Sequence, residues 1–110
     1  MENEMTTFKE YVIGAVSEAE VKPLKWAVDK KEENNVLLKD GSKTVYRMFK
    51  YKSKSHESHP YAVYVTKNSV NDCKDFKAML DFVEHMVKTA HFGAYSIPEM
   101  PKDVKAWLEK

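Results

Sequence analysis

Alternating apolar and polar residues mark the middle of the chain as a pair of β-strands. The alternation runs through residues 43–53, is interrupted by the polar loop 54–60, and resumes at residues 61–67. Because successive side chains of a strand point to opposite faces, a two-residue period is typical of a strand with one buried face. The sequence therefore predicts two neighbouring antiparallel strands, around which the rest of the chain is arranged.

The composition of the two faces indicates which side of this strand pair is buried. The odd-numbered positions of both strands are richer in large apolar and aromatic side chains, so we assign them to the core. The predicted core set is Val45, Phe49, Tyr51, Tyr61, Val63 and Val65, with Arg47 as its one charged member. The predicted solvent-facing set is Tyr46, Met48 and Tyr64 together with Lys50, Lys52 and Lys54.

The residues before this pair predict one helix and two further strands. Thr7 and Glu10 have the spacing of a capping box, and apolar residues then recur at helical spacing over residues 8–20. Residues 24–28 alternate like a half-buried strand. Residues 36–39 precede Asp40-Gly41, a pair that adopts the positive φ angles of a tight hairpin turn.

Two more helices are predicted after the strands. An apolar stripe at helical spacing spans residues 72–89, and Gly93 is typical of the position just past a helix. A shorter pattern covers residues 102–109. The prediction is therefore a single α+β domain, residues 1–110, with an antiparallel four-stranded meander sheet flanked by an N-terminal helix, a long helix after the sheet and a short C-terminal helix.

Composition is that of an ordinary globular protein. Of 110 residues, 43% are hydrophobic and 32% are charged, which is too apolar for a disordered chain. The single cysteine, Cys73, excludes a disulfide within the chain, and the N-terminus lacks the apolar segment of a secretory signal. The longest apolar run, residues 11–16, is far too short to cross a membrane. We expect a soluble, cytoplasmic protein without membrane contact.

A basic hairpin offers one candidate binding surface. Residues 43–54 contain no acidic residue, and aromatic rings are interleaved with the cations, so this stretch has the composition of a nucleic-acid-binding strand. Lysine on an outer strand also serves simply to block edge-to-edge pairing of sheets. The residues that would contact nucleic acid in this alternative are Lys43, Arg47, Lys50, Lys52 and Lys54.

The sequence carries no motif for catalysis, a cofactor or a metal. His56 and His59 lie in one loop, but a zinc site needs three or four ligands. Cys73 is predicted in the first turn of the long helix, where the helix field lowers a thiol pKa, yet no histidine is placed beside it to act as a base. Phosphate-binding loops and nucleophile elbows are absent from the sequence. We therefore expect neither an enzyme nor a bound cofactor.

These observations predict a small, non-catalytic regulatory or inhibitory module that binds a partner protein through the exposed face of its sheet. Exposed tyrosine, methionine and tryptophan are enriched at interface cores, which identifies the candidate contact residues. Self-association through the same surface is equally compatible with the pattern, and nucleic-acid binding is the alternative. The candidate contacts are Tyr46, Met48, Tyr64, Tyr95 and Trp107.

Overall fold

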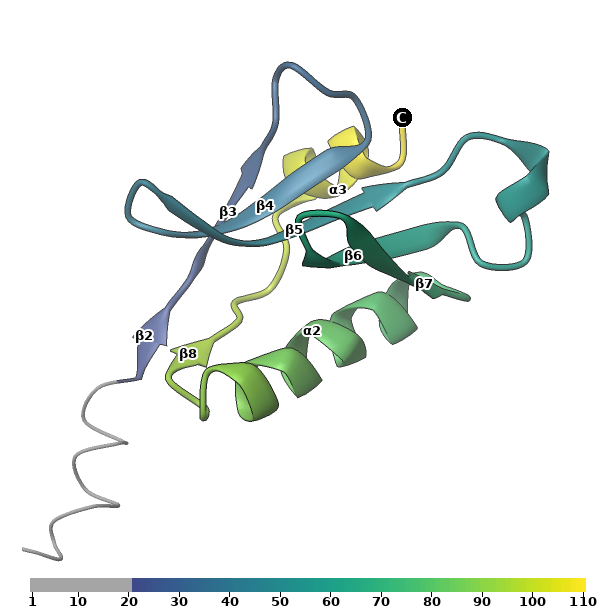
Figure 1. Ribbon diagram of the computed structural model, residues 1–110. Helices are drawn as coiled ribbons and strands as arrows, with labels where there is room; N and C mark the ends of the chain where they lie inside the picture. Colours follow the sequence, from purple (N-terminus) through teal and green to yellow (C-terminus); the bar gives the residue numbers. More distant parts are fainter. Residues whose placement is uncertain (1–20) are drawn as a thin grey trace, which may run out of the picture.

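The computed structural model describes residues 21–110, in which a five-stranded antiparallel sheet is covered on one face by two helices (Figure 1). The strands pair in chain order. They are β3 (Lys25–Val28), β4 (Asn35–Asp40), β5 (Lys43–Lys50), β6 (Tyr61–Thr66) and β7 (Ser69–Cys73). The helices are α2 (Phe76–Ala90), which packs on β6 and β7, and α3 (Lys102–Leu108), which packs on β3 and β4.

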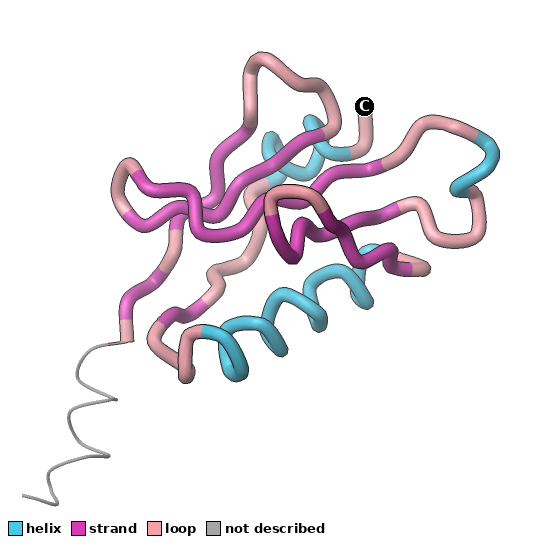
Figure 2. Tube along the Cα trace, viewed as in Figure 1, coloured by secondary structure: helices cyan, strands magenta, loops and turns pink. Residues whose placement is uncertain are grey.

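Short elements complete the fold. The strand β2 (Lys22–Pro23) pairs in parallel with β8 (Tyr95–Ser96), which ties the segment before β3 to the segment after α2 (Figure 2). A 3-10 turn, η1 (Lys54–His56), lies in the loop between β5 and β6. No helix within residues 21–110 is long and apolar enough to cross a membrane.

The structure confirms the α+β class and the antiparallel meander, but the sheet has five strands where four were predicted. Residues 69–73, of which 72 and 73 were predicted to begin the long helix, form the additional strand β7. The helix itself begins later, because Asp75 caps it by accepting a hydrogen bond from the backbone N–H of Ala78 at 2.7 Å. The predicted N-terminal helix, residues 8–20, lies outside the described residues.

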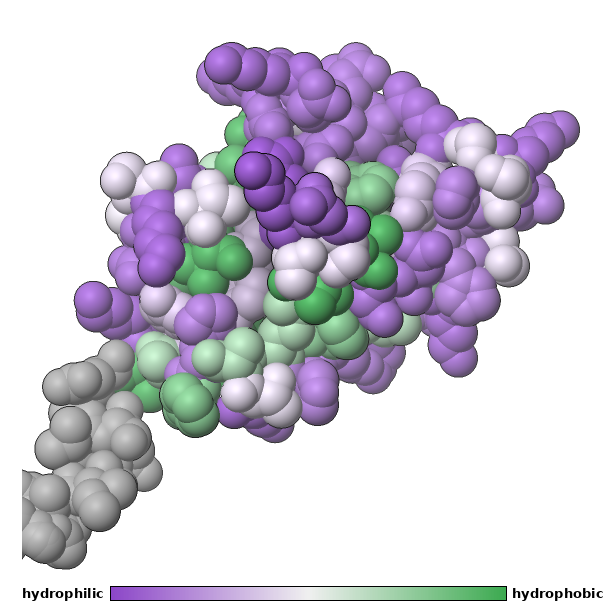
Figure 3. All heavy atoms as spheres, in the orientation of Figure 1, coloured by the Kyte–Doolittle hydropathy of each residue, from purple (hydrophilic) through white to green (hydrophobic). Residues whose placement is uncertain are grey.

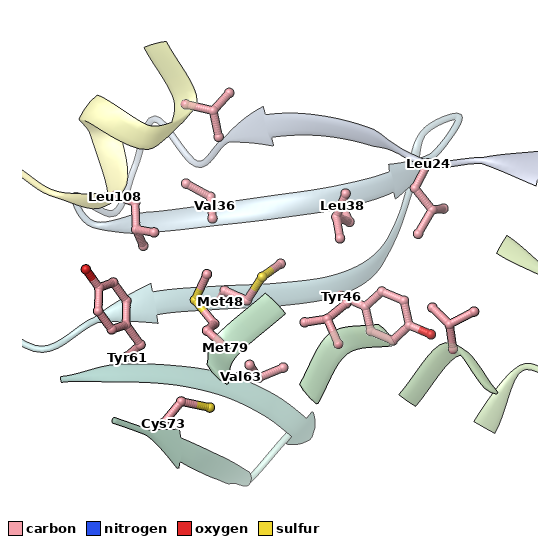
Figure 4. Close-up of a cluster of buried hydrophobic side chains, with 13 residues drawn as sticks. Leu24, Val36, Leu38, Tyr46, Met48, Tyr61, Val63, Cys73, Met79 and Leu108 are labelled. Atoms are coloured by element: carbon pink, nitrogen blue, oxygen red, sulfur yellow. The ribbon is translucent and has the colours of Figure 1, made fainter. Parts of the chain in front are cut away.

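The hydrophobic core lies between the sheet and the two helices (Figure 4). The predicted phase of β5 is wrong, because its even-numbered side chains face this core. Tyr46 is 2% exposed and Met48 is 0% exposed, and Met48 is paired across the sheet with the buried Val63. The core set comprises Leu24, Val36, Leu38, Tyr46, Met48, Tyr61, Val63 and Cys73 from the strands and the residues around them, with Met79, Val83, Val87, Val104 and Leu108 from the helices.

A one-residue irregularity in the β4–β5 hairpin causes this change of phase. Lys39 is opposite Thr44, but the next pair is Leu38 opposite Tyr46, so Val45 is an extra residue. A regular hairpin from the same turn would place Leu38 opposite Val45 and would turn Arg47 into the core. Because the side-chain period is two, a shift of one residue exchanges the faces of the whole strand beyond it.

Polar contacts fix the C-terminal helix to the sheet. Asn34, which has a positive φ of 66° and is 5% exposed, donates from Nδ2 to the backbone carbonyl of Leu108 at 2.9 Å. Lys50 at the end of β5 pairs with Glu109 at 2.6 Å, and the Tyr61 hydroxyl donates to the same carboxylate. The even phase of β5 therefore places Lys50 on the helix side as well, where it holds α3.

Replacing Met48 by alanine tests the assignment of the core. Because the Met48 side chain is fully buried, we expect Met48→Ala to lower the free energy of unfolding by about 2–5 kcal/mol, measured by urea denaturation. The matched control is Val65→Ala, where the valine is 47% exposed and the expected loss is below about 1 kcal/mol. Equal losses in the two variants would contradict this core.

Candidate protein-binding surface

The sheet face opposite α2 and α3 is the open face, defined here by the strand residues that alternate with the core set. Neither helix described in residues 21–110 packs on it. In Figure 1 α3 lies behind β4, so this view looks onto the open face of β3, β4 and β5. Its main side chains are Asn35, Leu37, Val45, Arg47, Phe49, Tyr64 and Val70.

An open groove of about 550 Å³ runs along this face between β5 and the β6–β7 hairpin. Figure 3 shows apolar atoms gathered over the middle of this view, within a rim that is mostly polar. The lining of the groove combines one aromatic ring and two valines with one carboxylate and two cations. Its lining is Glu32, Asn35, Thr44, Val45, Arg47 and residues 64–67.

Two bulges create the groove. β5 and β6 are paired only from Met48 to Lys50 and from Tyr61 to Val63, and beyond these residues the strands separate. Val45 is the extra residue of β5, and Val65 is the extra residue of β6, because Tyr64 is opposite Val70 whereas Thr66 is opposite Ser69. A bulged strand bends and twists more than a regular one, so the two strands diverge where each has its bulge.

A row of aromatic rings continues from the groove toward the β5–β6 loop. The ring of Phe49 lies 5.4 Å from that of Tyr64 and 4.9 Å from that of Tyr51, between ring centroids. The Tyr51 ring stacks on His56 at 3.6 Å, and its hydroxyl donates to Asp72 at 2.9 Å. Burial, helped by this hydrogen bond, raises the pKa of Tyr51 to about 12. These rings are half-buried by one another and present their remaining area to solvent.

Arg47 organises the floor of the groove. Its Nη1 donates to Asp29 at 2.7 Å and to the side-chain oxygen of Asn35 at 3.2 Å, which links the end of β3 to β4 and β5. The hydrogen bond from the guanidinium holds the pKa of the Asp29 carboxyl below its ordinary value of 3.8. Both charges are therefore neutralised locally, and the floor of the groove is polar without an excess of one sign.

The five residues predicted to contact a partner do not share one surface. Tyr46 and Met48 are core residues; burial raises the Tyr46 pKa to about 12, and its hydroxyl lies 2.6 Å from Nδ1 of His91. Tyr64 does lie on the open face, half-buried beside Phe49.

Tyr95 and Trp107 belong to other parts of the molecule. Tyr95 is in β8, with its hydroxyl 3.3 Å from Asp40. Trp107 is in α3 and donates from Nε1 to the carbonyl of Glu32 at 3.3 Å. Of the predicted contact set, only Tyr64 borders the groove.

The basic residues of the hairpin are also dispersed. Arg47 lies on the open face and Lys50 lies on the helix side, so the five cations do not form one stripe. Arg47, Lys50 and Lys52 are each paired with a carboxylate, at 2.7, 2.6 and 3.1 Å respectively. A phosphate group would have to compete with these carboxylates. The other two cations, Lys43 and Lys54, are the first and last residues of the stretch and do not form a pair.

The remaining chemical candidates, Cys73, His56 and His59, make polar contacts with residues close to them in the sequence. Cys73 is in β7 and not in the first turn of a helix, and it is 5% exposed. Burial raises the pKa of this thiol, which disfavours the reactive thiolate. The Nδ1 atoms of His56 and His59 each contact serine hydroxyls of their own loop. No group of three or more His, Cys, Asp or Glu residues within 21–110 is arranged to hold a metal ion.

Sequence reasoning did not identify Val45 and Val65 as groove residues, or Val70 opposite Tyr64 as part of this surface. The assignment of Val65 to the core is wrong, because its side chain is 47% exposed. The signal for Val70 was present, because residues 69–73 can pair with a preceding strand across a short turn. The two bulges left no signal, since valine is an ordinary strand residue. No protein-family model, curated protein or solved structure matches this chain.

The ion pair between Asp29 and Arg47 gives a pH-dependent test of the groove floor. A carboxyl whose pKa is lowered by folding stabilises the fold above the unfolded pKa, and this contribution disappears as the pH falls through the folded value. We expect Asp29→Asn to lose about 1 kcal/mol of unfolding free energy at pH 6, an upper value for a partly exposed pair. The difference from wild type should shrink as the pH falls below 3.8.

Urea denaturation at several pH values measures this difference. The matched control is Asp81→Asn, which breaks an exposed pair with Lys77 on α2 and should change stability less. A difference between wild type and Asp29→Asn that grew on acidification would contradict the assigned direction of the pKa.

Proposed function

We propose that this chain is a small, non-catalytic regulatory or inhibitory module that binds a partner protein through the open face of its sheet. The observation that carries the proposal is the groove between the two bulges, with apolar side chains exposed at its edge. Val65 is 47% exposed, and Val70, opposite Tyr64 on the neighbouring strand, is 37% exposed. Bulges occur preferentially beside functional sites, where they redirect side chains.

The chemistry of the groove suits a protein better than a charged polymer. The buried core of an interface is more apolar than the rest of the surface, enriched in aromatic residues and depleted in charged ones, with polar groups at the rim. Tyr64 and Val65 supply such apolar area in the groove lining, and the Phe49 ring adjoins that of Tyr64. The Arg47–Asp29 pair is already satisfied within the molecule. The carboxylate partners of Arg47, Lys50 and Lys52 make nucleic acid the weaker candidate. A free thiol at Cys73 is compatible with a reducing compartment, and a cytoplasmic location is part of the proposal.

Affinity capture from a lysate of the native host tests this proposal. The immobilised wild-type chain should retain one protein, both after nuclease treatment and at high salt. The double variant Tyr64→Ala/Val65→Ser should reduce its recovery at least about tenfold, because truncating residues at the centre of an interface removes most of the binding energy. Quantitative mass spectrometry of the retained proteins provides the measurement.

Two further variants make the capture interpretable. Lys77→Ala changes an exposed residue of α2, on the opposite face, and should retain the partner fully. Met48→Ala is unsuitable as a contact test because that residue is core. Equal recovery by all variants, or recovery of nucleic acid alone with binding that weakens steeply as salt rises, would contradict the proposal.

A further inference from the structure

One side of β5 lacks a strand partner beside the groove. β5 is paired with β4 along residues 43–49, apart from the extra Val45, but it is paired with β6 only along residues 48–50. Within the described part of the chain, residues 43–47 therefore have a neighbouring strand on one side only. The free N–H and C=O groups of such a strand edge are a template for pairing with another chain.

The alternation of backbone groups along β5 shows that Arg47 points into this gap. The N–H of Tyr51 donates to the carbonyl of Pro60, just before β6, at 2.8 Å. In an antiparallel pair of strands, residues that face the same neighbour recur at every second position, so the backbone groups of Phe49 and Arg47 also point toward β6. Phe49 is paired with Ala62, whereas Arg47 has no register partner in β6. At least one of the two hydrogen bonds that such a pair exchanges is therefore missing at Arg47.

Thr44 points the same way on the other side of the bulge. Asp40 and Lys43 flank a two-residue turn and are paired across β4 and β5, so their backbone groups point toward each other. In the next pair, Lys39 with Thr44, the alternation turns the N–H and C=O of Thr44 away from β4 and toward the groove. Thr44 lines the groove and has no register partner in β6. Thr44 and Arg47 thus offer backbone groups to a segment that lies in the groove.

The two ends of the groove have opposite charge. Because β5 and β6 run in opposite directions, Lys67 lines the groove at the end where Thr44 lies. Lys39, opposite Thr44, alternates with core residues and so lies on the open face at the same end. Glu32 lines the other end, where its carbonyl accepts a hydrogen bond from the N–H of Asn35 at 3.3 Å. Among residues 21–110, none of these three charged side chains is in an ion pair.

We propose that the partner protein inserts an extended segment into the groove, where it pairs with the backbone of β5 at residues 43–47. This binding mode rests on the proposed function and specifies the part of the partner that is recognised. Main-chain hydrogen bonds give such strand addition its affinity, and alternate side chains give it specificity. On the open face, the segment presents a carboxylate to Lys39 and Lys67. It presents an apolar side chain to Val45 and Val65, and a cation to Glu32.

The strand spacing fixes the sequence pattern of this segment. Lys39 and Asn35, at the two ends of the groove, are four residues apart on β4, which corresponds to about 13 Å. Residues four apart on an added strand span the same distance and lie on the same face. The intervening residues point toward the helices and must be small, because Tyr46 and Val63 already fill the core and are 2% and 0% exposed. The expected pattern is therefore a basic and an acidic residue four positions apart, with an apolar residue midway and small residues between.

Titration of the isotopically labelled full-length chain with a synthetic peptide tests strand addition. The probe is acetyl-Ser-Lys-Ala-Ile-Ala-Asp-Ser-amide, and its affinity is measured from the shifts of backbone amide signals in nuclear magnetic resonance spectra. We expect the shifts to concentrate at residues 43–47 and 64–67. An analogue with N-methyl groups on the isoleucine and both alanines keeps every side chain but loses backbone donors, so it should bind at least about tenfold more weakly.

Exchanging charges tests which end of the groove receives the carboxylate. Lys39→Glu/Lys67→Glu should weaken binding of the probe at least about fivefold, because the aspartate of the probe then meets like charge. A second probe with lysine in place of aspartate should recover that loss in the same variant. The matched control, Lys77→Glu/Lys88→Glu on α2, makes the same change in net charge on the opposite face and should bind the first probe like wild type.

Several results would overturn strand addition. They are no amide shifts at millimolar probe, equal binding of the N-methylated analogue, equal losses in the two double variants, and no recovery with the second probe. Shifts at these amides that depend on the concentration of the chain alone would identify a second copy as the occupant and would also overturn it. Because the titration needs no partner, each of these results leaves the proposed function standing. Binding of the probe together with a failed affinity capture would instead contradict the proposed function.

Discussion

The structure depends on one extra residue, Val45, in the hairpin between β4 and β5. Without it, Leu38 would oppose Val45 and the core face of β5 would carry Arg47, whose burial without a full set of partners is strongly unfavourable. With it, Tyr46 and Met48 turn toward α2 and Arg47 reaches Asp29 on the opposite face. The same shift brings Lys50 to Glu109, so one irregularity orients the core, the ion pair of the groove and the attachment of α3.

A second bulge at Val65 turns this rearranged sheet into a surface with a groove. The two strands stay paired only where both are regular, and they diverge where each has its additional residue. Arg47 with Asp29 and Asn35 closes the floor with satisfied polar contacts, while Tyr64, Val65 and Val70 leave apolar area at the edge. The satisfied polar contacts of Arg47 and the apolar area beside them are the physical basis of the partner binding that we propose for the open face.

Sequence patterns predicted the element types well and the phase of the central strand wrongly. The Asp40–Gly41 turn, the strands around it and both helices of residues 76–108 leave strong local signals, because spacing and turn chemistry are local properties. The phase of β5 depends on a bulge that an ordinary valine occupies, and both of its faces carry aromatic residues. Because of this phase, Tyr46 and Met48 are core residues and cannot contact a partner. Of the predicted contact residues, only Tyr64 lies beside the groove.

Proximity between Tyr46 and His91 is the most direct test of this account. The bulged register places the two rings 5.4 Å apart between centroids, with Tyr46 on the side of α2. The account predicts strong nuclear Overhauser effects between the ring protons of Tyr46 and His91 and none between Tyr46 and Tyr64. Contacts of Tyr46 with Tyr64, together with no contact to His91, would mean that β5 has the opposite phase and that the open face described here does not exist.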